Sequence, residues 1–280
     1  MFRNLKRYFS FNFLLYILGR FVAIRFFYKN FQIIKKKFTK SLIQKTNTNY
    51  LELDLNNKLI INKLKKEGFY DGLKLNDIIL SKLINLSNKS ELISTLDRKR
   101  FNNFQDVDNF NNQNDKPYCL LNLTNPELNK VAEEVSRDQI LLDIVNKYLG
   151  NINKIDTKIQ WSPVCNASDE WRHKNEQTVA FHYDVHHLNF VYIFFYLSEC
   201  NKNSGAHQLI SGSHLNKKFF KHLIGSARQT KESLEKDYSK NDFIIIEGKA
   251  GHGFIEDTSC YHRALIPMNN PRLALQFRYY

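Results

Sequence analysis

The segment Arg272–Tyr280 alternates apolar and polar residues along its whole length, and no other pattern in this sequence restricts the fold as strongly. Successive side chains of an extended strand point to opposite faces, so the alternation predicts a β-strand with two different faces. One face carries Leu273, Leu275, Phe277 and Tyr279. The other face carries Arg272, Ala274, Gln276 and Arg278. A polar face turned away from the main core is typical of the inside of a barrel that holds a ligand.

Further runs of aromatic and β-branched residues in the second half of the chain predict additional strands. Phe190–Leu197 and Phe243–Ile246 are the clearest of them. In the first half, apolar residues recur at helical spacing on both sides of the break Glu67–Gly72 and again over Leu128–Leu149, with Gly150 as a C-cap. We therefore expect a mainly β fold with flanking helices.

The composition favours one principal domain with reduced thiols. A chain of 280 residues that is 42% hydrophobic can bury a sizeable core without disulfide bonds. Its four cysteines are far apart in the sequence and form no C-x-x-C pair, so we expect free thiols in a cytoplasmic protein. Asn102–Asp115 is rich in Asn and Asp, which predicts a long loop that is either a solvated connection or a lid over a site.

The positive charge is concentrated at the N-terminus. The formal net charge is +13, and residues 1–51 contain eleven Lys and Arg residues and no acidic residue. The remaining body is therefore nearly neutral. Because the charge is confined to an arm, we expect no nucleic-acid partner. We divide the chain into a basic aromatic arm and linker, residues 1–51, and a domain over residues 52–280.

The arm contains the apolar, aromatic run Phe9–Tyr28, which Arg20 and Arg25 interrupt. Its uncharged stretches are too short to cross a bilayer, and no small-residue cleavage site follows, as a signal peptide would require. Two interpretations stay open. Residues 1–40 lie on an anionic membrane surface, which would make the protein peripheral to the membrane, or they form a helix packed on the domain or on a partner subunit. The first predicts that the arm is dispensable for chemistry.

Three separated residues have the chemistry of a metal site. His182 and Asp184 are two positions apart and share one face of an extended segment, and His262 follows far downstream. Two histidines and one carboxylate form the facial triad that suits iron(II) and leaves three coordination positions open. From His262 the chain runs through Pro267–Pro271 and returns at Arg272, which predicts a hairpin that places the Arg272 guanidinium beside the metal, ready to bind a carboxylate.

These motifs resemble the phytanoyl-CoA dioxygenase family of iron(II)- and 2-oxoglutarate-dependent oxygenases. The resemblance rests on His182 and Asp184, on the segment NSGAHQLISGSH from Asn203 to His214, and on His262 followed ten residues later by Arg272. It spans residues 60–280 and omits the arm. Ser211 stands where the family usually has proline, a departure that affects a turn and no ligand.

The resemblance implies a double-stranded β-helix, a jelly-roll fold of the cupin type. It implies Fe(II) bound by His182, Asp184 and His262, and 2-oxoglutarate bound by Arg272. The expected activity uses O2 and 2-oxoglutarate to hydroxylate a small-molecule, lipid or acyl-thioester substrate, with release of succinate and CO2. The intact Asp184 favours a hydroxylase over the related halogenases. The alternative is a catalytically silent cupin-like ligand-binding protein or a membrane-peripheral scaffold.

Several other residues have two interpretations from the sequence alone. Tyr192 is a candidate contact to 2-oxoglutarate, or a core aromatic. His186 and Arg278 either face the substrate or are structural or surface residues. Asp257 either caps a turn or orients His262, and His214 fits a turn residue that makes hydrogen bonds and binds no metal.

Overall fold

The structure is a computed structural model that describes residues 11–36, 43, 46, 48–52, 56–224 and 228–280. The helices are α2 (Phe11–Leu18), α3 (Val22–Lys36), α4 (Asn57–Glu67), α5 (Asp77–Ser87), α6 (Phe104–Gln113), α7 (Pro126–Ser136), α8 (Gln139–Leu149), α9 (Asp169–Lys174), α10 (Phe219–Ile224), α11 (Lys231–Leu234) and the 3-10 turn η1 (Lys240–Asp242). The strands are β1 (Phe69–Lys74), β2 (Glu91–Ser94), β3 (Arg100–Phe101), β4 (Leu121–Thr124), β5 (Ile155–Ser162), β6 (Val191–Tyr196), β7 (His207–Ile210), β8 (Phe243–Ile246), β9 (His252–Glu256), β10 (His262–Ala264) and β11 (Arg272–Tyr279).

The strands form two antiparallel sheets. The larger has the order β1-β9-β6-β11-β5-β4-β2-β3, and the smaller has the order β10-β7-β8. β11 lies in the middle of the larger sheet, paired with β5 along one edge and with β6 along the other. Its predicted alternation is confirmed, because Leu273, Leu275, Phe277 and Tyr279 are buried in the main core. The prediction of a fold rich in sheet with flanking helices is also confirmed.

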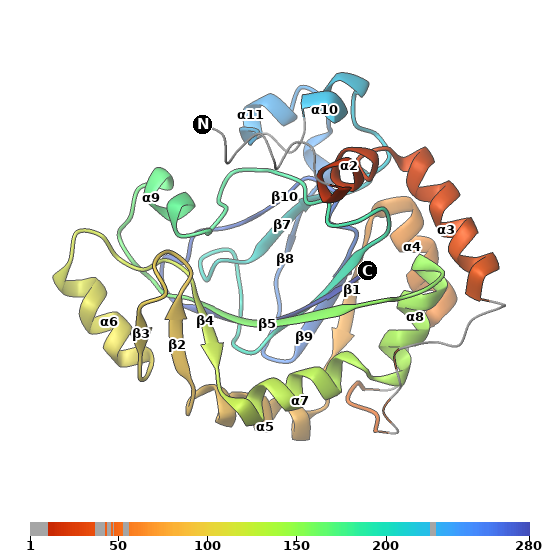
Figure 1. Ribbon diagram of the computed structural model, residues 1–280. Helices are drawn as coiled ribbons and strands as arrows, with labels where there is room; N and C mark the ends of the chain where they lie inside the picture. Colours follow the sequence, from red (N-terminus) through yellow and green to blue (C-terminus); the bar gives the residue numbers. More distant parts are fainter. Residues whose placement is uncertain (1–10, 37–42, 44–45, 47, 53–55, 225–227) are drawn as a thin grey trace.

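Helices cover the outer face of the larger sheet. α5 and α7 run together beneath β5, and α4 and α8 pack beside β1 (Figure 1). Apolar residues from these helices and from the outward face of the sheet form one continuous core. The other face of the sheet is left for the polar residues of β5, β6 and β11, opposite the smaller sheet.

The predicted helix, extended segment and helix around Gly68 are confirmed as α4, β1 and α5. α4 ends at Gly68, which has a φ of +84°. A Cβ at this position would lie 2.3 Å from Cys260 Sγ and 2.7 Å from His214 Nδ1. Glycine therefore allows the start of β1 to pack directly against the segment that leads to His262.

Two sequence predictions about local structure need correction. Asn102–Asp115 is not a long loop, because it contains α6. The Asn103 side chain caps this helix by accepting a hydrogen bond from the Asp106 amide, and Val107 is buried. The predicted helical stretch Leu128–Leu149 is interrupted at Asp138, which caps α8, although α8 does end at Gly150 as predicted.

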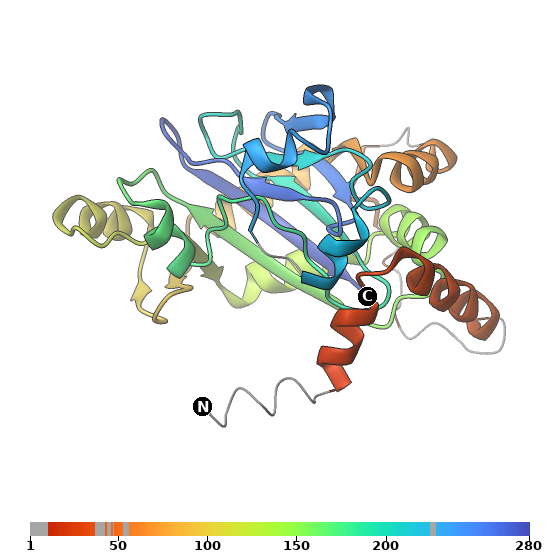
Figure 2. The same cartoon turned by 90° about the horizontal axis from the view of Figure 1, so that it is seen from above.

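The arm packs on the body in two places. At the junction of α2 and α3, the space for a Cβ on Gly19 is taken by the His187 carbonyl and the Val185 side chain. In α3, Arg25 is only 9% exposed and forms an ion pair of 2.6 Å with Asp257. Figure 2 shows these N-terminal helices against the edge of the body. Packing on the domain, the second interpretation of the arm, therefore describes this face of α3.

The opposite face of α3 is exposed and aromatic. Phe27 is 71% exposed and Phe31 is 61% exposed. Among the residues that the structure describes, no helix is long and apolar enough to span a membrane. Contact of this face with a membrane surface stays a prediction, and so does the division of the chain at residue 51.

Candidate metal centre and pocket

His182, Asp184 and His262, far apart in the sequence, come together in the structure. His182 and His262 form an antiparallel bridge in which each amide donates to the carbonyl of the other, at 3.0 and 2.8 Å. The Asp184 amide donates to the Thr258 carbonyl at 2.8 Å. These backbone hydrogen bonds hold the segment 182–184 against the segment 258–262. One potential ligand atom from each of the three residues therefore falls within 4.8 Å of the others.

The orientation of both imidazoles suits metal binding. His182 Nδ1 lies 3.2 Å from the Ala180 carbonyl, and His262 Nδ1 lies 3.0 Å from the Cys260 carbonyl. A carbonyl oxygen only accepts hydrogen bonds, so each Nδ1 must carry the proton and each Nε2 keeps its lone pair. These Nε2 atoms lie 3.8 and 3.9 Å from the two carboxylate oxygens of Asp184. Two lone pairs and a carboxylate therefore face one point.

The protonation states also fit a cation. Burial lowers the pKa of His262 to about 4 and lowers the pKa of His182 below its ordinary value. Burial alone would raise the pKa of Asp184, but the nearby His262 and His182 outweigh it and hold that pKa below its usual range. Neutral imidazoles and an ionised carboxylate are the forms that bind metal ions.

The triad lines a pocket of about 380 Å³ between the two sheets. The polar face of β11 forms one wall, and Lys158 and Gln160 of β5 lie beside it. Phe194 and Phe254 stack with ring centroids 4.8 Å apart and close another side. The predicted ligand-holding face of β11 therefore does line a cavity.

Arg272 reaches this pocket by a different route from the predicted one. The hairpin prediction is wrong, because β10 pairs with β7 in the smaller sheet while β11 pairs with β5 and β6 in the larger. The turn after Leu265 carries the chain from one sheet to the other. Arg272 Nη1 donates to the Gly205 carbonyl at 2.7 Å, and its buried Nε has no hydrogen-bond partner in the part of the chain that the structure describes.

Tyr192, His186 and Arg278 all line the pocket, at the end away from Arg272. Tyr192 is paired with Arg278 across β6 and β11, and the Arg278 guanidinium lies 4.9 Å from the centre of the Tyr192 ring. His186 also stacks on Tyr192, with its ring centroid 5.5 Å from that of Tyr192. Of the two interpretations of Arg278, the structure therefore favours a residue that faces the cavity.

A buried acid that was not predicted from the sequence lies beside the triad. Glu256, at the end of β9, lies 2.6 Å from His207 Nε2 and 3.5 Å from His262 Nδ1. Burial raises the pKa of Glu256 to about 8 and lowers the pKa of His207 to about 3. Inward-facing positions on β7 and β9 could have suggested both residues, but short strands give a weak pattern.

The segment around Ser211–His214 contacts the residues that precede His262 in the chain. The Tyr261 amide donates to Ser213 Oγ at 2.8 Å, and Lys217 Nζ donates to the carbonyls of Ser213 and Ser259. The His214 ring lies 3.2 Å from the Lys65 carbonyl, in keeping with a structural role. These bonds fix the chain just before His262.

Asp257 has a larger role than the turn cap considered from the sequence. Its carboxylate accepts hydrogen bonds from the Ser259 amide and hydroxyl, as a cap would. It also accepts from Tyr148 Oη at 2.8 Å and from Arg25 at 2.6 Å. No feature of the sequence near Asp257 indicated that its partner comes from the arm.

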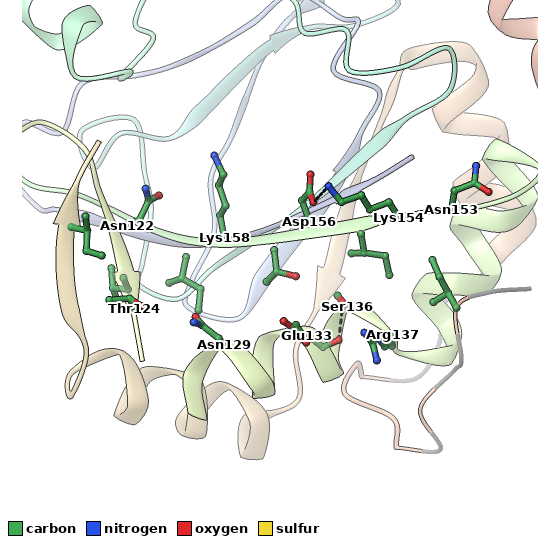
Figure 3. A pocket seen from close by; sticks show the side chains of 16 residues that line it. Asn122, Thr124, Asn129, Glu133, Ser136, Arg137, Asn153, Lys154, Asp156 and Lys158 are labelled. Carbon is green, nitrogen blue, oxygen red and sulfur yellow. Dashed lines mark hydrogen bonds and ion pairs between the residues drawn. The ribbon is translucent and has the colours of Figure 1, made fainter. Parts of the chain in front are cut away.

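A larger hollow of about 900 Å³ lies on the other side of β5. Figure 3 shows it between β5 and α7, where Asn129 and Glu133 of the helix face the sheet. The side chains of Asp156 and Lys158 project from β5 away from α7 (Figure 3). The triad does not line this hollow, so we place the candidate active site in the smaller pocket.

The structure is similar to that of the non-heme alpha ketoglutarate dependent epimerase SnoN from nogalamycin biosynthesis, with a TM-score of 0.54 and 11% sequence identity over 80% of this chain and 82% of that chain. The structure of SnoN in complex with Fe3+, alpha ketoglutarate and nogalamycin RO has a TM-score of 0.50 at 11% identity, with the same coverage of 80% and 82%. This chain shares the SnoN fold. No family model and no curated protein matches its sequence.

Proposed function

We propose that this protein is an iron(II)- and 2-oxoglutarate-dependent dioxygenase that hydroxylates a small-molecule, lipid or acyl-thioester substrate. The observation that carries the proposal is the convergence of two imidazole lone pairs and one carboxylate in a pocket between two sheets. The similarity to SnoN, a non-heme alpha ketoglutarate dependent epimerase, supports the general class of 2-oxoglutarate-dependent chemistry, and the hydroxylation is our proposal. The motif order supports the finer assignments, a relationship to the phytanoyl-CoA dioxygenase family and a double-stranded β-helix.

In this proposal His182, Asp184 and His262 hold Fe(II) on one face and leave the other face open. When bound, the metal and 2-oxoglutarate supply the oxidising chemistry with O2, and succinate and CO2 are the co-products. Arg272 binds the far carboxylate of 2-oxoglutarate, for which its unpartnered Nε is available. Tyr192 lines the same pocket, and the charges of Asp184 and Arg278 act on its hydroxyl, so it would be a second contact for the cosubstrate.

The other pocket residues position the substrate and exclude water. The stacked Phe194 and Phe254 rings form a dry wall, and the Nδ1 hydrogen bonds of both histidines keep their rings from turning. We propose residues 52–280 as the catalytic unit of a cytoplasmic protein, with the arm docked on it and its aromatic face available to an anionic membrane.

Metal analysis tests the ligand assignment. Wild-type protein should bind one equivalent of Fe(II), and His182→Ala, Asp184→Ala and His262→Ala should each lose most of it. His252→Ala is the matched control, because His252 pairs with Asp71 outside the triad. Stoichiometric iron in all three triad variants would refute the assignment.

Turnover distinguishes the enzyme from its alternative. An oxygenase of this class forms succinate from 2-oxoglutarate with consumption of O2, whereas a silent ligand-binding protein or scaffold does not. A screen of extracted lipids and acyl thioesters should therefore show succinate formation together with a mass gain of one oxygen. Absence of succinate from iron-loaded protein under every condition would favour the silent alternative.

A further inference from the structure

The pocket has a cationic group at each end. Arg272 and Arg278 lie on the same face of β11, six residues apart, which corresponds to about 20 Å along an extended strand. The charge of Arg272 lowers the pKa of His207, whereas the charge of Arg278 lowers the pKa values of Asp184 and His186. A short dicarboxylate held by Arg272 and the metal therefore cannot also occupy Arg278.

Arg278 makes no direct ion pair with a described carboxylate, although its charge lowers the pKa values of Asp156 and Asp184. Its guanidinium lies over the Tyr192 ring, and its buried Nε has no hydrogen-bond partner in the described part of the chain. Its partner across β5 is Asp156, whose carboxylate is already bound by Tyr280 Oη at 2.8 Å and Lys154 Nζ at 3.0 Å. Of the carboxylates that the structure describes, none lies within the 4.0 Å of an ion pair with Arg278.

A second cation lies beside Arg278. Lys158 of β5 is paired with Gln276 of β11, one step along the same face from Arg278, and it projects into the pocket side of the sheet (Figure 3). Lys158 is exposed at the rim of the pocket, where partial burial and the charge of Arg278 lower its pKa while Glu176 and Asp156 oppose the shift. Two like charges at the edge of a partly dry pocket repel each other, and an anion placed between them would turn this repulsion into attraction.

We propose that the substrate carries an oxyanion, a carboxylate or a phosphate monoester, that Arg278 and Lys158 bind on the side of the triad opposite Arg272. Arg278 can offer two parallel N–H donors to such a group, and Lys158 adds a point charge. The anion then fixes the register of the substrate, so that the carbon to be oxidised lies over the open face of the triad. This inference rests on the proposed function, because it takes Arg272 as the cosubstrate site.

Calorimetric titration of the protein loaded with Fe(II) and saturating 2-oxoglutarate tests the inference. The probes are hexanoate and hexyl phosphate, with hexanol as the neutral molecule of the same chain length. Saturating 2-oxoglutarate keeps the probes away from Arg272. We expect at least one anion to bind and hexanol not to bind at the same concentration, and the stronger probe identifies the anion as carboxylate or phosphate.

Two variants locate the anion. Arg278→Gln and Lys158→Gln should each lower the affinity for the anionic probe by about tenfold or more. Arg278→Lys should retain part of the affinity. Lys82→Gln is the matched control, because it removes the same charge from an exposed lysine that pairs with Glu127 outside the pocket. The visible charge-transfer band of Fe(II) with 2-oxoglutarate should persist in every variant, which shows that each still folds.

The outcomes separate the two proposals. If wild-type protein forms no complex with Fe(II) and 2-oxoglutarate, the proposed function fails first. If the complex forms but neither anion binds, or hexanol binds as well as the anions, the oxyanion site is refuted. Unchanged probe affinity in both Arg278→Gln and Lys158→Gln would refute it as well.

Discussion

Arg272 is held in place by a backbone carbonyl and a hydroxyl rather than by a carboxylate. Its guanidinium donates to the Gly205 carbonyl and to Ser162 Oγ, which leaves its positive charge available to a ligand. Arg272→Leu should therefore weaken 2-oxoglutarate binding by about 2 to 5 kcal/mol, since the ligand carboxylate would be left buried and unpaired. Titration of the charge-transfer band with 2-oxoglutarate gives the dissociation constant. Arg100→Leu is the control, because it removes an arginine that forms an exposed ion pair with Glu91. An unchanged dissociation constant would contradict the assignment.

Arg25 and Asp257 form a buried ion pair that links the arm to the segment before His262. Removal of one partner leaves the other charge buried, so Arg25→Met and Asp257→Asn should each lower the free energy of unfolding by about 3 to 5 kcal/mol. The double variant should lose clearly less than the sum of the two. Urea denaturation of all four proteins gives the coupling, and strict additivity would show that the pair is not coupled.

The same pair has a defined pH dependence. Burial would raise the pKa of Asp257, but Arg25, His214 and the hydrogen bonds to the carboxylate hold that pKa well below its usual range. A depressed carboxyl pKa stabilises the fold above about pH 4 and loses this stabilisation as pH falls through the lower, folded value. The loss in free energy of unfolding caused by Arg25→Met should therefore become smaller only in strongly acidic solution.

At the residue scale, the sequence predicted the triad better than its surroundings. His182, Asp184 and His262 could be chosen because their types and order match a chemical pattern. Lys158 and Glu256 could not, because a single Lys or Glu in a strand is ordinary until the partner strands are known. Their environment is set by residues far away in the sequence, Arg278 for Lys158 and His207 for Glu256.

At the scale of elements, the errors have a common physical origin. Arg272 was expected next to His262 through a hairpin, but local turn chemistry does not determine which strand pairs with which. In the structure the Leu265 amide donates to the Ala206 carbonyl just beyond the paired ends of β10 and β7, and β11 joins the larger sheet. Likewise, the Asn and Asp residues of α6 masked the helical spacing of its few apolar residues, among them the buried Val107.

The exposed aromatic face of α3 gives a prediction of its own. Phe27 and Phe31 point away from the body and lie on a helix that ends in Lys35 and Lys36, a combination that complements an anionic bilayer. The double variant Phe27→Ser/Phe31→Ser should weaken binding to anionic vesicles by about 1 kcal/mol or more per residue, and binding by wild-type protein should fall but persist in part as salt rises.

Ile78→Ser is the matched control for vesicle binding. Ile78 is exposed on α5, which belongs to a different part of the surface without the basic arm. Its substitution should leave vesicle binding unchanged. Equal binding by the α3 double variant, or no binding by wild-type protein, would show that this face contacts no membrane.

For the whole molecule, buried neutral histidines predict acid lability. Burial lowers the pKa of His182, His207, His214 and His262. The unfolded chain therefore takes up protons at these sites below about pH 6.5, and the free energy of unfolding falls with pH. Glu256, with its pKa raised to about 8, acts in the opposite direction but is a single group.

The expected net loss for metal-free protein is about 2 to 5 kcal/mol between pH 7 and pH 5. Urea denaturation in the presence of a chelator measures it. Bound iron(II) should make the loss steeper, since protons and metal compete for the same Nε2 atoms. A free energy of unfolding that stays constant over this range would mean that the histidines are not held neutral in the folded state.

The position of β11 in the larger sheet also has a kinetic consequence. β1, β9 and β6 form one block and β5, β4, β2 and β3 form another, and β11 is the strand that pairs with both. Each of these pairings joins segments distant in the sequence, and contacts of this kind close slowly during folding. We therefore expect two partly ordered blocks to accumulate before a slow final step, in which insertion of β11 completes the sheet and creates the ligand pocket at the same moment.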